Sequence, residues 1–366
     1  MTGEPPQPAH RTLTSLMRAL LRDDVAEARA LLGKADIDFP AMGTLLDKSR
    51  LSGYLYTLVA DTGLVGLLPP WLLDQLVAGY RRQLGKSADH LVLVEKLRLV
   101  LGEASIPFMT IKGLYLAQRF YGDIRRRFMS DVDILVHTGE LGAAVTAVAQ
   151  LGLYPAPGIS VDPQTPFWGI HAVEVRGNSG VLDIHHAIRK LPGINFDYEG
   201  LWNNASVFTI DDSRLVSLCD TDTLLIATVG LGADIQNSHH NLRKIWDIYM
   251  ILRQLDAAVD WADFFSLRER EGSLKLVLNV FAFCLLLAAA TDDCPSLGRA
   301  MSAHSRLILI KNTAQAETIF TRNRQHLANR MLFSRLLPVS SPHYWLRWLV
   351  TLPARVWHYR RTIPGH

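Results

Sequence analysis

The most constraining feature of this 366-residue chain is a short run of branched aliphatic residues that carries two carboxylates. Asp131 and Asp133 alternate with the apolar residues at 132, 134 and 136, a pattern typical of a β-strand. Side chains two apart on a strand point to the same face, so the two carboxylates are expected to meet at one point. A third carboxylate, Asp183, lies in the apolar run 181–185, which also predicts a strand. Three convergent carboxylates predict a site for a hard divalent cation such as Mg²⁺, which keeps coordination positions open for water and phosphate.

The segment just before these aspartates supplies groups suited to phosphate binding. Residues 106–111 read as a buried strand, and residues 114–121 have helical spacing. Lys112 and Gly113 lie at the junction, where the first amides of a helix are free to bind an anion. The arginines at 125–127 add positive charge next to the carboxylates. Cations beside acids are what phosphoryl or nucleotidyl transfer requires, because charge builds up on phosphate oxygens.

At these residues the chain resembles the DNA polymerase β-like nucleotidyltransferase superfamily and, within it, the bacterial type 5 family of uncharacterised nucleotidyltransferases. The shared pattern is a Lys-Gly after a strand, a Tyr-x-Asp at 121–123, an arginine four residues before Asp-x-Asp-x-Leu-Val, and a later Asp-x-His at 183–185. Residues 242–248, followed by Asp260-Trp261, are similar to a helical segment of the same family. The resemblance spans roughly residues 20 to 300.

The resemblance implies an α+β or α/β fold in which a polymerase β-like mixed sheet with flanking helices lies between N-terminal and C-terminal helical regions. It also implies an enzyme that moves NMP from an NTP to a hydroxyl acceptor, with Mg²⁺ as cofactor and release of pyrophosphate. Asp131 and Asp133 would hold two Mg²⁺ ions, with Mn²⁺ as an alternative. Asp183 would complete the metal site and act as the base for the hydroxyl. The triphosphate would be bound by Lys112, Gly113 and Arg127.

Four further residues are candidates for substrate binding, each with a structural alternative. Arg126 could contact substrate or be solvated. His185 shares a strand face with Asp183, so it could contact substrate or make a structural hydrogen bond. Lys244 and Asp247 lie three apart on a predicted helix, where an intrahelical ion pair is the alternative to a role at the cleft.

Periodicity divides the chain into five regions. We expect a disordered tail at 1–10, a helical region at 11–100, the nucleotidyltransferase core at 101–210, a helical domain at 211–300 and a basic, aromatic region at 301–366. Within the core, residues 173–175 and 181–184 predict a hairpin, and helices are expected from 215 onward. The apolar run 276–290 is too short for the ~20 residues of a membrane-spanning helix, so a buried helix is expected.

Cysteine usage and the N-terminus favour a cytoplasmic protein. Cys219, Cys284 and Cys294 are odd in number and show no paired spacing, which favours a reducing compartment. The first residues, Met-Thr-Gly-Glu-Pro-Pro, show no apolar stretch of the kind found in a signal peptide.

Residues 301–366 carry ten Lys or Arg against one acid, a net charge of +9 in a chain whose total is +3. Residues 340–361 interleave aromatic and basic side chains, which could contact RNA or an anionic membrane, or could pack on the core. The other expected partners are an NTP of undetermined base and an acceptor that could be a small molecule, a peptide or protein, or tRNA. Two rival functions stay open: a kinase-like phosphotransferase using the same site, and a non-catalytic nucleotide-binding or regulatory protein.

Overall fold

The computed structural model describes residues 8–157, 171–188, 191, 193–237, 241–321, 332, 335 and 336. The expected tail lies mostly outside these residues, as does the whole of 340–361, so the predictions of RNA, membrane or core contact for that segment are not addressed by the structure.

Helices form the N-terminal part of the protein. Asp24 and Asp38 cap two of them by accepting hydrogen bonds from backbone N–H groups in the first turn, at Glu27 and Ala41. A proline at the first position starts the longest helix, of 34 residues, where its missing N–H costs nothing. These helices are α1 (Ala9–Leu21), α2 (Val25–Leu32), α3 (Phe39–Ser49), α4 (Ser52–Asp61) and α5 (Pro70–Glu103).

A seven-stranded mixed sheet follows, with the order β3-β4-β5-β2-β1-β7-β6. Its central strand β2 pairs antiparallel with β1 and parallel with β5, and β1 pairs parallel with β7. The outer pairs are antiparallel. The strands are β1 (Phe108–Ile111), β2 (Val132–Val136), β3 (Tyr154–Pro155), β4 (Ala172–Gly177), β5 (Gly180–His185), β6 (Ser206–Ile210) and β7 (Ser213–Ser217).

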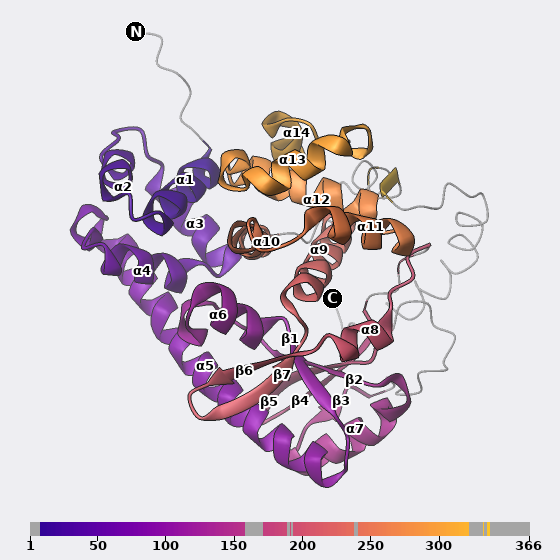
Figure 1. Ribbon diagram of the computed structural model, residues 1–366. Helices are drawn as coiled ribbons and strands as arrows, with labels where there is room; N and C mark the ends of the chain where they lie inside the picture. The colour runs from indigo at the N-terminus through magenta and orange to yellow at the C-terminus, as the bar shows by residue number, and fades with distance from the viewer. Residues whose placement is uncertain are drawn as a thin grey trace.

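Alternation along β2 decides which side chains reach which face of the sheet. Val132, Ile134 and Val136 belong to a buried cluster with residues of α5 and of α7 (Leu141–Val148). Leu135 belongs to a second cluster, with the helices on the opposite face. Asp133 alternates with the first set and therefore lies on the second face, under those helices. In Figure 1, α5 and α7 run along the outer side of the sheet and the remaining helices lie on its other side.

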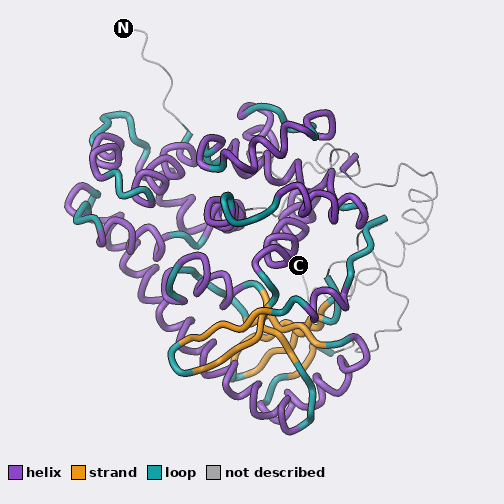
Figure 2. Tube along the Cα trace, viewed as in Figure 1, coloured by secondary structure: helices purple, strands orange, loops and turns teal. Residues whose placement is uncertain are grey.

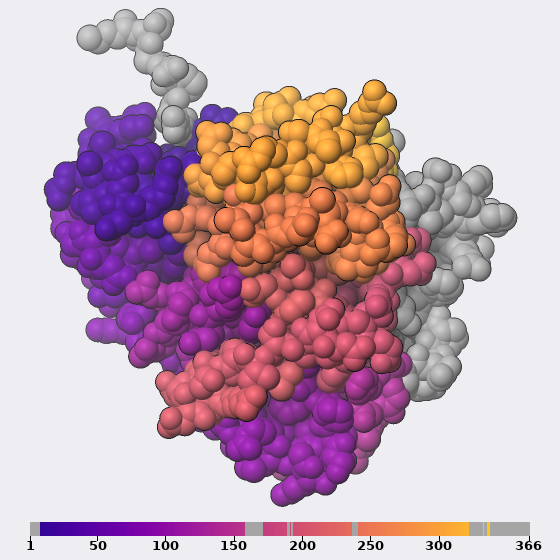
Figure 3. Space-filling model, viewed as in Figure 1, coloured from indigo at the N-terminus to yellow at the C-terminus, as the bar shows by residue number. Residues whose placement is uncertain are grey.

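The helices that cover the second face of the sheet come from parts of the chain before, within and after the strands. Figure 2 shows the strands gathered at one end of the molecule and the helices filling the other. In Figure 3 the N-terminal helices and the C-terminal helices lie side by side as one surface. Thr14 of α1 donates a hydrogen bond to the carbonyl of Leu287, which joins the two groups. Besides the N-terminal helices given above, the helices on this side are α6 (Gly113–Tyr121), α8 (Tyr198–Asn203), α9 (Asp220–Asn237), α10 (Leu242–Leu255), α11 (Trp261–Glu271), α12 (Leu274–Leu287), α13 (Pro295–Ala303) and α14 (Thr313–Thr321).

The mixed sheet with flanking helices confirms the expected fold class, and β4 and β5 confirm the expected hairpin. The apolar run 276–290 lies largely in the buried helix α12, as predicted. The expectation of helix from 215 is wrong for its first residues. Residues 213–217 form β7, because alternation of Leu215 with exposed neighbours lets the strand complete the sheet beside β1. Among the described residues no helix has the length and apolar character to cross a membrane.

Candidate active site

The junction between β1 and α6 sets the position of Lys112. Its backbone has φ 58° and ψ −107°, a conformation that residues other than glycine rarely adopt and that costs on the order of 1–3 kcal/mol. The next residue, Gly113, starts α6 against Met129; a Cβ at this position would lie 3.2 Å from the Met129 Sδ atom. The glycine therefore lets α6 approach the loop that leads into β2, and the sharp turn brings the Lys112 side chain toward the sheet.

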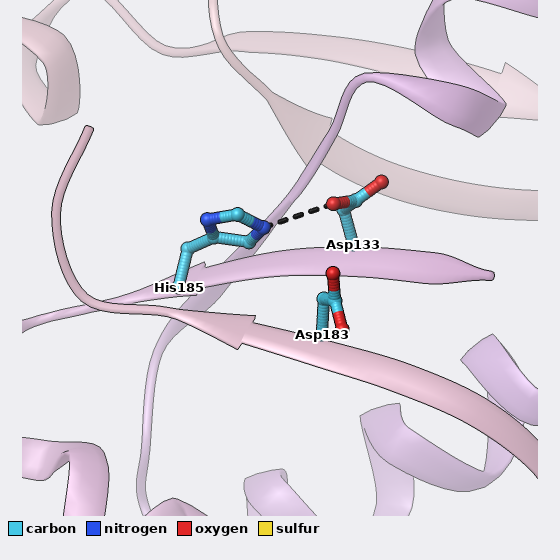
Figure 4. Close-up of side chains that lie close together, drawn as sticks. All are labelled: Asp133, Asp183 and His185. Carbon is cyan, nitrogen blue, oxygen red and sulfur yellow. Dashed lines mark hydrogen bonds and ion pairs between the residues drawn. The ribbon is translucent and has the colours of Figure 1, made fainter. Parts of the chain in front are cut away.

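Register brings two carboxylates and an imidazole together beside this lysine. Asp133 of β2 pairs with Ile111 on one side and with Asp183 of β5 on the other. His185 lies two residues beyond Asp183 and shares its face (Figure 4). One ligand atom from each of Asp133, Asp183 and His185 lies within 4.8 Å of the others. The sheet thus gathers three metal-ligating groups on the face covered by the helices.

Lys112, Asp133 and His185 form a close triangle around one carboxylate oxygen. The Lys112 Nζ lies 2.6 Å from the Asp133 Oδ1, and His185 Nε2 lies 2.9 Å from the same oxygen and 3.1 Å from Nζ. In one tautomer Nε2 donates to Asp133, and in the other it accepts from Lys112. In the second tautomer Nε2 carries the lone pair that could also ligate a cation beside Oδ1.

The surroundings shift the pKa values of Asp133, Asp183 and His185 in different directions. Burial alone would raise the pKa of Asp133, but Lys112 and His185 outweigh it and hold that pKa well below its usual range. Burial, together with the charges of Asp133 and Asp131, raises the pKa of Asp183 to about 7. Burial and the nearby Lys112 ammonium lower the pKa of His185, so the imidazole is neutral and available as a ligand.

The donor set fits a divalent cation. The Asp183 Oδ1 is buried and has no hydrogen-bond partner among the described residues, an arrangement that is costly unless a ligand fills it. Carboxylate oxygens suit Mg²⁺, and an additional imidazole nitrogen suits Mn²⁺ as well. Asp133, Asp183 and His185 would hold the ion, which would supply positive charge to phosphate oxygens.

Asp131 lies at the edge of this group. It immediately precedes β2, is partly exposed and accepts a hydrogen bond from the Ser130 hydroxyl at 2.9 Å. Its charge contributes to the raised pKa of Asp183, which places it near the cluster without making it one of the three mutually close ligands.

Arg127 is already paired within the protein. Its guanidinium makes a two-pronged contact with the Asp247 carboxylate of α10, with both distances 2.7 Å. The Tyr121 hydroxyl donates to the same carboxylate at 2.7 Å, and all three side chains are buried. These three side chains connect α10 to the loop before β2. Arg127 therefore fixes the position of this loop and also lines the cavity.

The other predicted substrate-binding residues divide between the cavity and the surface. Lys244 pairs with Asp234 of α9 and not with Asp247, so the intrahelical pair, the structural alternative to a role at the cleft, is absent from the described ion pairs. Arg126 pairs with Asp61 of α4 at 2.8 Å and does not line the cavity.

A cavity of about 360 Å³ joins these groups. Lys112, Gly113, Arg127, Asp131, Asp133, Asp183, His185, Lys244 and Asp247 all line it. Its wall also holds three ionisable residues that the sequence analysis did not select: His171, Asp234 and Arg243. His171 precedes β4, and Asp234 is the one acid in the largely apolar stretch 224–235, so neither carried a recognisable pattern. Arg243 lies in the segment 242–248 that resembles the family, but nothing in the sequence favours it over Lys244.

Sequence comparison identifies the class. The model of the family described as uncharacterised nucleotidyltransferase matches residues 35–289. The chain belongs to this nucleotidyltransferase family, and the protein is a transferase enzyme of that class. No curated protein sequence matches the chain.

Similar solved structures are distant. The solution structure of the antibiotic-resistance factor ANT(2'')-Ia is 12% identical, with a TM-score of 0.38 over 52% of this chain and 96% of that one. The crystal structure of ANT(2'')-Ia in complex with adenylyl-2''-tobramycin is 12% identical, with a TM-score of 0.35 over 50% and 98%. An antigenic nucleotidyltransferase-like protein from Paracoccidioides brasiliensis is 14% identical, with a TM-score of 0.30 over 60% and 93%.

Proposed function

We propose that this enzyme transfers NMP from an NTP to a hydroxyl-bearing acceptor in a Mg²⁺-dependent reaction that releases pyrophosphate. The observation that carries the proposal is the convergence of Asp133, Asp183 and His185 beside Lys112 in one cavity. Carboxylates for a cation and a lysine for phosphate lie together there, as this chemistry requires.

Each residue has a role that its surroundings support. Asp133, Asp183 and His185 would hold Mg²⁺. Asp131, at the edge of this cluster, would bring a further carboxylate to it. The Lys112 ammonium and the Gly113 amide bind the triphosphate, and Arg127 holds the loop before β2 in place through Asp247. Bound ions would neutralise charge that develops on the phosphate oxygens.

Asp183 is suited to take the acceptor's proton. Its side chain lies in the cavity beside the site for the ion, and a carboxylate oxygen that does not contact the ion can accept a proton. The acceptor oxygen forms a bond to the α-phosphorus as the bond from that phosphorus to the β-phosphate bridging oxygen breaks. The proton passes to Asp183, and the β- and γ-phosphates leave as pyrophosphate.

Parallel reactions with α-labelled and γ-labelled NTP test the proposal. The purified protein is incubated with each of the four NTPs, Mg²⁺ and a fractionated cell extract that contains acceptors. We expect α-label to enter an acceptor and γ-label to appear as pyrophosphate, both dependent on Mg²⁺ and both absent with Asp133→Asn. Transfer of γ-label to the acceptor would show a kinase and overturn the proposal.

A further inference from the structure

The basic side chains that line the cavity differ in how they are neutralised. Three of them form ion pairs with carboxylates, namely Lys112 with Asp133, Arg127 with Asp247 and Lys244 with Asp234. The fourth, Arg243 in the first turn of α10, forms no ion pair with any residue that the structure describes. A positive charge in the cavity wall is therefore left without its counter-ion.

Arg243 is held in place by contacts that do not neutralise it. Its Nη1 donates to the Phe128 carbonyl at 3.0 Å, and the guanidinium carbon lies 5.9 Å from the centre of the Phe128 ring. Its Nε is buried and has no hydrogen-bond partner among the residues described here. Burying a charge without a partner costs free energy, so an unpaired guanidinium in a cavity wall indicates a ligand that supplies the missing anion.

The charges around Arg243 also disfavour it in the unliganded protein. Burial and the neighbouring Arg127 lower the pKa of Arg243, and the opposing effects of Asp247 and Asp131 do not restore it. Asp247 is already taken by Arg127, whereas Asp131 lies at the edge of the metal-ligating cluster. Arg243 thus lies within electrostatic reach of Asp131, at the edge of that cluster.

We propose that Arg243 is the phosphate-binding residue on the helical side of the cavity and that it takes the β- and γ-phosphates of the NTP and the departing pyrophosphate. This inference rests on the function proposed above. A guanidinium presents several N–H donors in a planar fork that matches two phosphate oxygens, and one hydrogen bond to Phe128 leaves others free. Lys112 on the sheet and Arg243 on α10 would then hold the polyphosphate from two sides.

A phosphate-binding role and a structural role predict different stabilities. If Arg243 serves the ligand, the neutral variant Arg243→Gln keeps an amide N–H donor and loses an unpaired, partly buried charge. The ligand-free variant should then melt at or above the temperature of the parent. If Arg243 serves the fold, the same change should lower the melting temperature and leave ligand binding intact.

Calorimetric titration of Mg²⁺-pyrophosphate into parent, Arg243→Gln and Arg243→Lys tests the proposal. We expect about 10-fold to 100-fold weaker binding for Arg243→Gln, the loss of one charge-assisted hydrogen bond, and partial recovery for Arg243→Lys, which restores the charge. Arg119→Ala is the matched control, because Arg119 pairs with Asp220 and does not line the cavity; it should bind as the parent does.

The outcomes separate the two proposals. If the parent binds Mg²⁺-pyrophosphate and Arg243→Gln binds it equally well, the role of Arg243 is overturned and the proposed function stands. If the parent binds neither Mg²⁺-pyrophosphate nor any Mg²⁺-NTP, both are overturned. If Arg243→Gln does not fold, Arg243→Lys takes its place and is compared with Arg119→Ala. Arg243→Lys lacks the planar guanidinium, so binding of Mg²⁺-pyrophosphate as strong as in the parent would contradict the proposal.

Discussion

Lys112 and Asp133 form a 2.6 Å ion pair on the oxygen that also lies 2.9 Å from His185 Nε2. The lysine therefore neutralises a carboxylate that we propose as a metal ligand. If a cation bound there, it would compete with the ammonium for Asp133, and a displaced ammonium would be free to contact an anion.

The first prediction follows from this competition. Lys112→Met should strengthen Mn²⁺ binding several-fold in the absence of nucleotide, because the ion no longer displaces an ammonium. The same change should weaken binding of Mg²⁺-NTP, because the phosphates lose a cation. Titration of Mn²⁺ followed by electron paramagnetic resonance measures the first effect, and calorimetry measures the second. Weaker Mn²⁺ binding in the variant would show that Lys112 assists the metal.

Asp183 gives a prediction about pH in the metal-free protein. Its folded pKa of about 7 lies above the usual value for aspartate, so the folded state holds its proton where the unfolded state has lost it. The free energy of unfolding should therefore fall as pH rises from about 4 to 7 and show no further loss from this group above that range. Asp183→Asn removes the effect, so the variant should gain stability over the parent at pH 8 and gain least at pH 4. Chemical denaturation at both pH values in the presence of chelator measures this, and an equal difference at the two values would contradict it.

The buried pair of Arg127 and Asp247 should matter for folding as well as for the site. Asp247→Ala leaves a buried guanidinium without a counter-ion, which costs about 3–5 kcal/mol. Asp234→Ala removes the partner of the more exposed Lys244 and should cost about 1 kcal/mol or less. Urea denaturation of both variants measures the loss in free energy of unfolding. Equal losses would show that leaving Arg127 unpaired costs no more than leaving the more exposed Lys244 unpaired.

The sequence predicted the parts of this protein that depend on local pattern. Alternation placed Asp133 on one face of its strand. The spacing of Asp183 and His185 placed both on one face of β5, which pairs with β2 in the sheet. Residue types and order also identified Lys112 and Gly113 at the strand–helix junction. These features could be predicted because strand alternation fixes the face of each side chain without reference to the rest of the chain.

Pairing between distant elements could not be predicted in the same way. Nothing in the local pattern shows that Arg127 reaches Asp247, or that Lys244 reaches Asp234 instead of the acid three residues away. These partners depend on how α9 and α10 lie over the sheet. Arg243 was missed for the same reason, because its lack of a partner becomes visible only once every other cation in the cavity has one.

We propose that Asp133 holds the metal through which this cavity binds an NTP. Calorimetric titration of each NTP into the parent and into Asp133→Asn, with Mg²⁺ and with chelator, tests it most directly. Asp61→Asn serves as the control, because Asp61 pairs with Arg126 and does not line the cavity. We expect the parent and Asp61→Asn to bind at least one NTP strongly only with Mg²⁺, and Asp133→Asn to lose that metal-dependent binding. Equal NTP binding by the parent with Mg²⁺ and with chelator, or by Asp133→Asn and the parent, would contradict it.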